Sequence, residues 1–282
     1  MGFSVNTNVG ALAALQSLGS TNKAMAQTQG RINSGYNVAS TKDDSAAYAI
    51  AQTLRSDMGG LQAVGSSLNR AKSVTDVAVA GAEQISDILI DMKKKAYEAA
   101  SSVDQASRDA INQDFVALRD RITTVVNSAD FNGTNILKSG GGSVSALQSL
   151  QDGVSGGTWD PDSLSVANQA LDLGGSVITV ATTGQIDTQA AAQAMVDTLT
   201  TSQSNLKTSL STLGSASRKI DAQLSFTSKL SDVIEGSVGN LVDADLAKES
   251  ARLQALQVKQ QLGIQALSIA NQAPQAIMSL FR

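Results

Sequence analysis

A heptad repeat of mostly apolar residues runs through the first third of the chain without a change of phase. It consists of two series of positions seven residues apart, Leu54, Leu61, Leu68, Thr75, Ala82 and Leu89 in one and Ile50, Asp57, Val64, Ala71, Ala78, Ile85 and Met92 in the other. Such an a/d repeat is typical of a long helix that packs along another helix. Because the repeat keeps its phase through Gly59-Gly60, it predicts a single helix from about Asp44 to about Ala100.

A second repeat of this kind occupies the last third of the chain, with Leu199, Leu206, Leu213, Ile220, Thr227, Ile234 and Leu241 seven residues apart. Shorter apolar patterns predict a helix before the first repeat and another directly after it, the latter with Ile111, Phe115, Leu118, Ile122 and Val125 on one face. The N- and C-terminal halves of the chain therefore have mirrored patterns of predicted helices, each with one long helix. The sequence therefore predicts a mainly α fold in which the N- and C-terminal regions form an antiparallel coiled-coil rod of long helices.

The middle of the chain has a different character. From Ser139 to about Asp187 it is rich in Gly and Ser, and the stretch "SVITVATTG" has the pattern of a strand. Just before it, Asn132-Gly133 is a signal for a tight turn between short strands. We expect a small mixed or β domain inserted between the helical halves.

The composition excludes several kinds of chemistry. The chain contains no histidine and no cysteine, so it has no His/Cys metal site, no cysteine nucleophile and no histidine general base. Its net charge is -4 without a basic stripe, which argues against nucleic acid as a partner. No run of apolar residues is long enough to span a membrane, and the N-terminus lacks the pattern of a cleaved signal peptide. No cofactor is expected.

The last predicted helix, which begins near "DADLAKE" with Asp243 as the expected N-cap, is apolar over most of its circumference. A helix of this kind must be covered on most sides. The N-terminal segment can cover one side, and further copies of the same pair of segments or another partner must cover the others. Identical subunits in a head-to-tail contact that does not close form a helical filament. An ordinary intramolecular helix pair is the alternative that this pattern leaves open.

Long stretches at both ends of the chain resemble a known family. The N-terminal half contains "SVNTNVGALAALQSL", "RINSGYNVASTKDDSAAYAIAQTLRS" and "ADFNGTNIL", and the C-terminal half contains "LGSASRKIDAQLSF" and "NLVDADLAKESARLQALQVKQQLGIQALSIANQAPQAIMSLFR". In this order they resemble bacterial flagellin, the subunit of the flagellar filament. The stretch "QQLGIQALSIANQ" is similar to flagellins of alphaproteobacteria.

The resemblance implies a layered organisation. Residues 1–34 and 247–282 would form an inner terminal coiled-coil layer, residues 35–138 and 187–246 a helical rod domain, and residues 139–186 a small variable outer domain. It also implies the function of a structural subunit that polymerises into the helical filament used for swimming. Such a subunit leaves the cell through a type III export apparatus without a cleaved signal peptide, so the chain is expected in the extracellular flagellum.

The partners that the resemblance implies are further copies of the chain, an export chaperone, the filament cap protein and the hook–filament junction proteins. Neither nucleic acid nor membrane insertion is expected. The residues predicted to carry self-assembly are apolar positions of the two terminal segments: Leu12, Leu15, Leu18, Met25, Ile32, Leu253, Leu256, Leu262, Leu267, Ile269, Ile277 and Leu280.

One departure from the family pattern concerns an immune receptor. Flagellins sensed by the vertebrate Toll-like receptor carry an Arg-x-x-Glu-Leu type patch on the long rod helix. The matching stretch is "IDMKKKAYEAAS", in which Met92 stands where Arg is expected and Lys95 where Glu is expected. The resemblance therefore implies poor activation of that receptor.

Other functions explain the sequence less well. Ser20-Thr21-Asn22-Lys23 fits the S-x-x-K nucleophile motif, but the companion motifs S-D-N and K-T-G are absent. Asp243, Asp245 and Glu249 lack the spacing of an EF-hand and are better explained by helix capping. A type III translocator would need a membrane-inserting apolar segment. The closest alternative is a hook–filament junction protein, which is built on the same terminal layers.

Overall fold

The structure is a computed structural model that describes residues 7–152 and 161–280. The chain divides into two compact units. One consists of residues 1–56 and 233–282, and the other of residues 57–232. The mainly α fold with a small β insertion is confirmed, and each unit is described below by itself.

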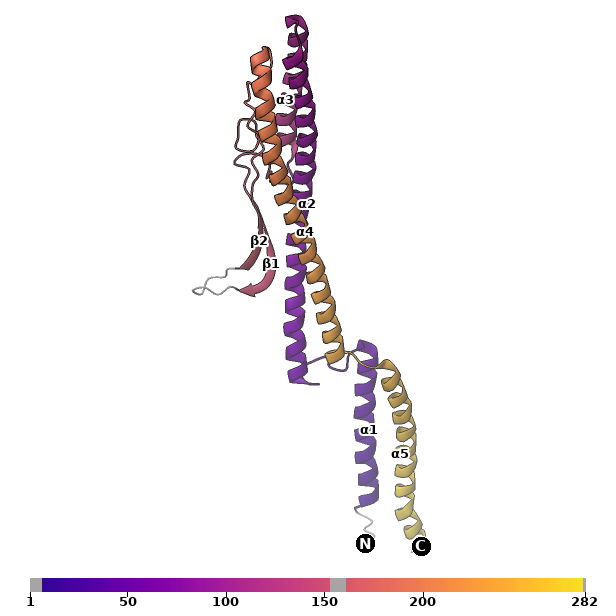
Figure 1. Ribbon diagram of the computed structural model, residues 1–282. Coiled ribbons are helices and arrows are strands. Elements are labelled where there is room, and N and C mark those ends of the chain that lie inside the picture. Colours follow the sequence, from indigo (N-terminus) through magenta and orange to yellow (C-terminus); the bar gives the residue numbers. More distant parts are fainter. Residues whose placement is uncertain (1–6, 153–160, 281–282) are drawn as a thin grey trace. The chain divides into compact units, whose positions relative to one another are not determined.

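The unit of residues 57–232 is built on three helices, α2 (Ser45–Ser101), α3 (Gln105–Ser128) and α4 (Gln189–Val242), of which α2 and α4 also extend into the other unit. The predicted single helix through Gly59-Gly60 is confirmed. These helices lie side by side in Figure 1 and share one hydrophobic core. Leu199, Leu206, Leu213 and Ile220, the positions of the predicted repeat on α4, are all at most 1% exposed. Burial of each such side chain contributes about 1.5–3 kcal/mol.

Two glycines in α2 make room for the chain that follows α3. A Cβ atom on Gly81 would lie 2.8 Å from Cδ1 of Leu137, and one on Gly60 would lie 2.6 Å from Cδ2 of Leu150. Leu137 is completely buried against the helix, whereas Leu150 is partly exposed. The glycines therefore cost helix propensity but allow the chain that follows α3 to pack closely on α2.

The insertion contains a two-stranded antiparallel sheet of β1 (Val144–Asp152) and β2 (Pro161–Val166), with Val144 opposite Val166. The predicted turn at Asn132-Gly133 is confirmed. Both residues have positive φ, 54° and 79°, and Phe131 and Thr134 exchange backbone hydrogen bonds of 3.0 and 3.1 Å. This is the geometry of a tight hairpin turn.

The strand predicted at "SVITVATTG" is wrong. In the structure this segment forms only an isolated bridge, between Ile178 and Leu173. Its buried side chains, Ile178 and Val180, pack into the helical core. Thr179 between them donates its backbone N–H to Ser202 Oγ at 3.0 Å and its hydroxyl to the Thr198 carbonyl at 3.2 Å. The alternating pattern thus reflects an extended segment that lies on α4 and binds its side chains and backbone.

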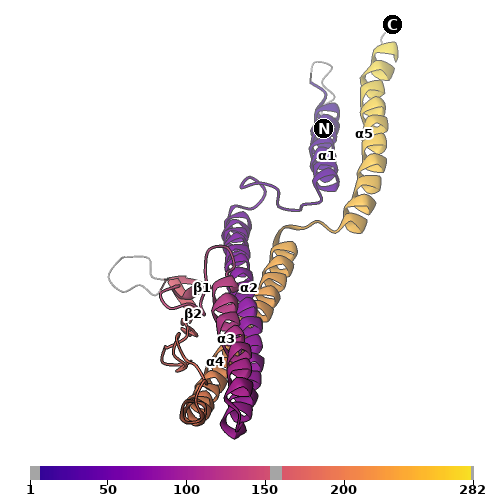
Figure 2. The same ribbon diagram turned by 90° about the horizontal axis from the view of Figure 1, so that it is seen from above.

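The other unit contains α1 (Val9–Ser34) and α5 (Leu246–Leu280), which lie side by side (Figure 2), together with the adjoining ends of α2 and α4. Helix α1 has Asn8 as its N-cap and Gly35, whose φ is 75°, as its C-cap. The segments that follow α1 and α4 pair through their backbones, because Ala244 donates to the Gly35 carbonyl and Asn37 to the Val242 carbonyl, both at 2.8 Å.

The N-cap predicted for the last helix is wrong by two residues. Asp245, not Asp243, accepts a hydrogen bond from the backbone N–H of Lys248 at 3.0 Å. Asp243 instead forms an isolated bridge with Tyr36. The backbone pairing thus extends the linker and delays the start of α5 until Leu246.

Candidate self-assembly surface

The seam between α1 and α5 follows a heptad pattern on both helices. On α5 every residue that is at least partly buried from residue 249 to residue 270 falls on one of two series. In each series the residues are seven positions apart: Glu249, Leu256, Gly263 and Ala270 in one, and Leu253, Gln260 and Leu267 in the other. On α1 the corresponding series contain Ala11, Leu18, Met25 and Ile32, and Ala14, Thr21 and Thr28. The terminal helices therefore form a two-stranded coiled coil within the chain.

The contacts along this seam define an antiparallel register. The Asn8 side chain donates to the Ala270 carbonyl at 2.7 Å near one end. The Gln260 amide donates to Asn22 Oδ1 at 2.9 Å near the middle. At the other end Arg31 Nη1 and Glu249 Oε1 are 3.3 Å apart. Gly263 allows close approach, because a Cβ atom placed there would lie 3.3 Å from Leu18 Cδ1.

An apolar groove opens beside the seam. Leu12 and Leu15 of α1 are 57% and 56% exposed. Together with Leu267 and neighbouring residues they line a hollow of about 410 Å³. Leu12 and Leu15 are therefore available to a partner, whereas the seam itself is already filled.

Helix α5 presents apolar side chains on sides that α1 does not cover. Leu262 and Ile269, seven residues apart on one flank, are 57% and 68% exposed. Val258, 55% exposed, precedes Leu262 by four residues and lies on the same flank, whereas Ile264, also 55% exposed, lies on another side of the helix. Exposed apolar side chains on more than one side of a helix are typical of surfaces that take part in protein–protein contacts.

The predicted assembly residues whose side chains the structure describes therefore fall into two groups. Leu18, Met25, Ile32, Leu253, Leu256 and Leu267 lie in the intramolecular seam. Leu12, Leu15, Leu262 and Ile269 are exposed. Ile277 and Leu280 lie outside the residues whose side chains the structure describes. We call the exposed group, together with Val9, Val258 and Ile264, the terminal apolar surface.

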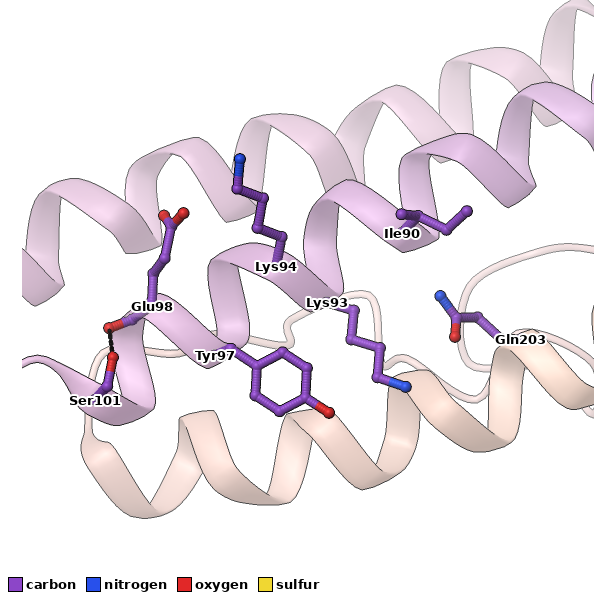
Figure 3. Close-up of a pocket in the computed structure, with 7 residues that line it drawn as sticks. All are labelled: Ile90, Lys93, Lys94, Tyr97, Glu98, Ser101 and Gln203. Carbon is purple, nitrogen blue, oxygen red and sulfur yellow. Dashed lines mark hydrogen bonds between the residues drawn. The ribbon is translucent and has the colours of Figure 1, made fainter.

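The unit of residues 57–232 has a second exposed patch, which the sequence analysis did not predict. Ile90 and Tyr97 of α2 are 56% and 55% exposed and line a hollow of about 530 Å³. Figure 3 shows Lys93 and Lys94 between them and Gln203 of α4 at the edge of the hollow. The sequence contained one signal for this patch: Ile90 and Tyr97 are seven residues apart but belong to neither a/d series of α2.

The two residues of the receptor-related stretch lie in different environments. Met92 is completely buried in the core, so its side chain contributes nothing to the surface. Lys95 is partly exposed and forms ion pairs with Asp114 of α3 at 2.8 Å and with Glu98 at 3.6 Å. The hydrogen bond to Asp114 raises the pKa of Lys95 above its ordinary value, so this ammonium is charged and engaged at neutral pH.

Comparison with known proteins gives the family. The family model of the bacterial flagellin N-terminal helical region matches residues 5–140, and that of the C-terminal helical region matches residues 194–281. The chain belongs to the bacterial flagellin family. It is 45% identical to Flagellin FljM of Caulobacter vibrioides, with 99% of this chain and 98% of that protein covered. It is 36% identical to a flagellin of Brucella melitensis, with 99% of each chain covered.

These relationships assign the general function. The chain is an alphaproteobacterial flagellin, a structural subunit of the flagellar filament rather than an enzyme, and the junction-protein alternative is not favoured. As a filament subunit it is part of an extracellular flagellum. Among the described residues, no helix has the length and apolar character needed to cross a membrane.

Proposed function

We propose that this flagellin polymerises by covering its terminal apolar surface with the same surface of neighbouring copies. The supporting observation is that Leu12, Leu15, Leu262 and Ile269 remain more than half exposed although α1 and α5 are already paired. Contacts between copies of one chain extend without limit when they do not close into a ring. The seam residues then act indirectly, because they hold α1 and α5 together as one unit that presents this surface.

The layer boundaries extend this proposal. Residues 1–34 and 247–282 would form the inner layer, since α1 ends at Ser34 and α5 begins at Leu246. Residues 35–138 and 187–246 would form the rod domain around it, and residues 139–186 the outer domain. Family resemblance supports export without a cleaved signal peptide, and an export chaperone, a filament cap protein and junction proteins as partners.

Assembly of purified variants tests the surface. Leu262→Ser with Ile269→Ser should abolish filaments after addition of seeds, as seen by negative-stain electron microscopy, because both side chains would lose their apolar contact with a neighbour. The free variant should keep its helical content, since neither side chain lies in the seam. Gln265→Ser, at an exposed position of the same helix, is the matched control. Normal filaments from the double variant would contradict the proposal.

A seam variant separates the two groups of residues. Leu267→Asp places a charge between α1 and α5, so it should give monomer without filaments and also weaken the α1–α5 pair in the free chain. Circular dichroism of this variant beside Leu262→Ser with Ile269→Ser distinguishes loss of the pair from loss of the surface. Short, capped assemblies from the unmodified chain would instead favour a junction protein.

We also propose that this flagellin activates the vertebrate Toll-like receptor poorly. Lys95 stands where the family pattern has Glu, and its charge is paired with Asp114 and Glu98. Met92 adds no surface group at the position where Arg is expected. A reporter-cell assay should give low potency for the monomer, and full potency would refute the idea.

A further inference from the structure

An ion pair interrupts the apolar seam of the α1–α5 coiled coil. Glu249 occupies the same heptad series as Leu256, Gly263 and Ala270, and its side chain is only 9% exposed. Arg31 of α1 pairs with it at 3.3 Å and is 21% exposed. A second arginine, Arg252, reaches the same carboxylate at 3.8 Å but is 53% exposed. At this position of the seam, as far as its side chains are described, the two helices thus recognise each other by charge.

This ion pair is incompletely satisfied. Arg31 Nε and Glu249 Oε2 are buried without a hydrogen-bond partner among the described residues. A buried pair of this kind contributes little net stability, because the desolvation of both charges offsets their attraction. Separation of the partners is nevertheless very costly, since it leaves a buried charge alone. Such a pair therefore discriminates between arrangements more than it stabilises any one of them.

We propose that the Arg31–Glu249 pair fixes the register in which α1 and α5 associate. Apolar heptads alone do not select a register, since they repeat every seven residues. A shift of one heptad that brings Ala270 opposite Leu18 also brings Leu256 opposite Arg31. The opposite shift brings Ala24 opposite Glu249. Each slipped register buries one charge against an apolar side chain.

The inference rests on the proposed function, because the register decides which side chains form the terminal apolar surface. A slip of one heptad changes which of Leu12, Leu15, Leu262 and Ile269 lie beside one another. A copy with a slipped seam would present a different surface to its neighbours. Filament growth from identical subunits requires that every copy presents the same one.

Disulfide mapping can read the register directly, because the chain contains no cysteine. A Cβ atom at Gly263 would lie 3.9 Å from Leu18 Cβ, and one at Gly10 would lie 4.0 Å from Ala270 Cβ. Both distances suit a disulfide. Leu18→Cys with Gly263→Cys therefore reports the observed register, and Leu18→Cys with Ala270→Cys reports a slip of one heptad.

The experiment compares the pair Leu18→Cys with Gly263→Cys and the pair Leu18→Cys with Ala270→Cys in the full chain. The chain is oxidised during seeded assembly, and the soluble fraction is analysed beside the filaments on non-reducing gels with peptide mass spectrometry, because slipped copies are excluded from filaments. With Arg31 and Glu249 present, only the in-register pair should form an intramolecular disulfide. In the background Arg31→Met with Glu249→Leu, which keeps an apolar seam, the slipped disulfide should increase at least about tenfold. If the slipped disulfide stays absent in that background, apolar packing or the backbone pairing of Gly35 and Asn37 with Ala244 and Val242 sets the register, and the proposal is overturned.

Charge exchange provides a second measurement. Arg31→Glu should raise the critical concentration for assembly about tenfold or more, because two carboxylates then meet in the seam. Adding Glu249→Arg to this variant should restore assembly and the in-register disulfide. Failure of the exchanged pair to restore either would also count against the proposal. Absence of filaments from the unmodified chain would contradict the proposed function, which is a different outcome.

Discussion

Substitution of Gly81 by alanine tests how closely Leu137, in the segment that follows α3, packs on α2. The added Cβ would lie 2.8 Å from Leu137 Cδ1 and 3.4 Å from Ala129 Cβ. Leu137 is completely buried, so it has no open space into which to turn. Replacement of glycine by alanine inside a helix gains about 1 kcal/mol of helix propensity. Overpacking costs about 1–3 kcal/mol, so the net effect should be a loss of up to about 2 kcal/mol.

Gly65 is the matched control, since it lies in the same helix and an added Cβ would meet nothing within 4 Å. Gly65→Ala should therefore stabilise the protein by about 1 kcal/mol. Urea unfolding of the monomer, followed by helical ellipticity, gives both free energies. The difference between the two variants isolates the overpacking cost, because the gain in helix propensity is common to them. Equal stabilisation by both substitutions would refute the close packing of Leu137.

A double-mutant cycle checks the assigned contact. Leu137→Ala in the unmodified chain should cost about 2–5 kcal/mol, as expected for a buried leucine. In the Gly81→Ala background the same substitution should cost less, because it also relieves the overlap with the new methyl group. Additive effects would show that the cost of Gly81→Ala arises elsewhere.

Two further predictions concern the turns and caps of the unit of residues 57–232. The backbone N–H of Ser107 donates to the Asp104 carboxylate at 3.0 Å, and this hydrogen bond lowers the pKa of Asp104. The ionised N-cap therefore stabilises α3 fully at pH values above the ordinary pKa of a carboxyl group. This stabilisation is lost as the pH falls through the lowered pKa. Asp104→Asn keeps a capping oxygen without a titrating group, so its helical content should depend less on pH in acid than that of the unmodified chain; identical acid titrations would contradict this. Gly133→Ala forces alanine to a φ of 79° and should cost about 1–2 kcal/mol in urea unfolding, and an unchanged free energy of unfolding would show that the turn relaxes.

The long helices could be predicted from the sequence alone, because the heptad position of a residue gives the side of the helix on which it lies. This is a local property of the chain. The repeat of α4 predicted its buried residues, and the phase of the α2 repeat through Gly59-Gly60 predicted an unbroken helix. The sequence contains no histidine and no cysteine, and this excluded metal sites, nucleophiles and general bases that are built on these residues. The terminal stretches also contained enough of the family pattern to indicate a flagellin.

Only the tertiary structure decided which segment packs against each predicted apolar face. Leu18 and Leu262 belong to the same kind of apolar pattern, yet one fills the seam between α1 and α5 and the other is exposed. Gly81 is explained only by Leu137, which lies far along the chain. Val180 alternates like a strand residue but packs on a helix. Glu249 was predicted near the start of the last helix, but its partner, Arg31, depends on the register of two distant segments. The periodicity of apolar residues specifies which face of a helix is apolar. Which segment packs on that face depends on contacts between residues that are far apart in the chain.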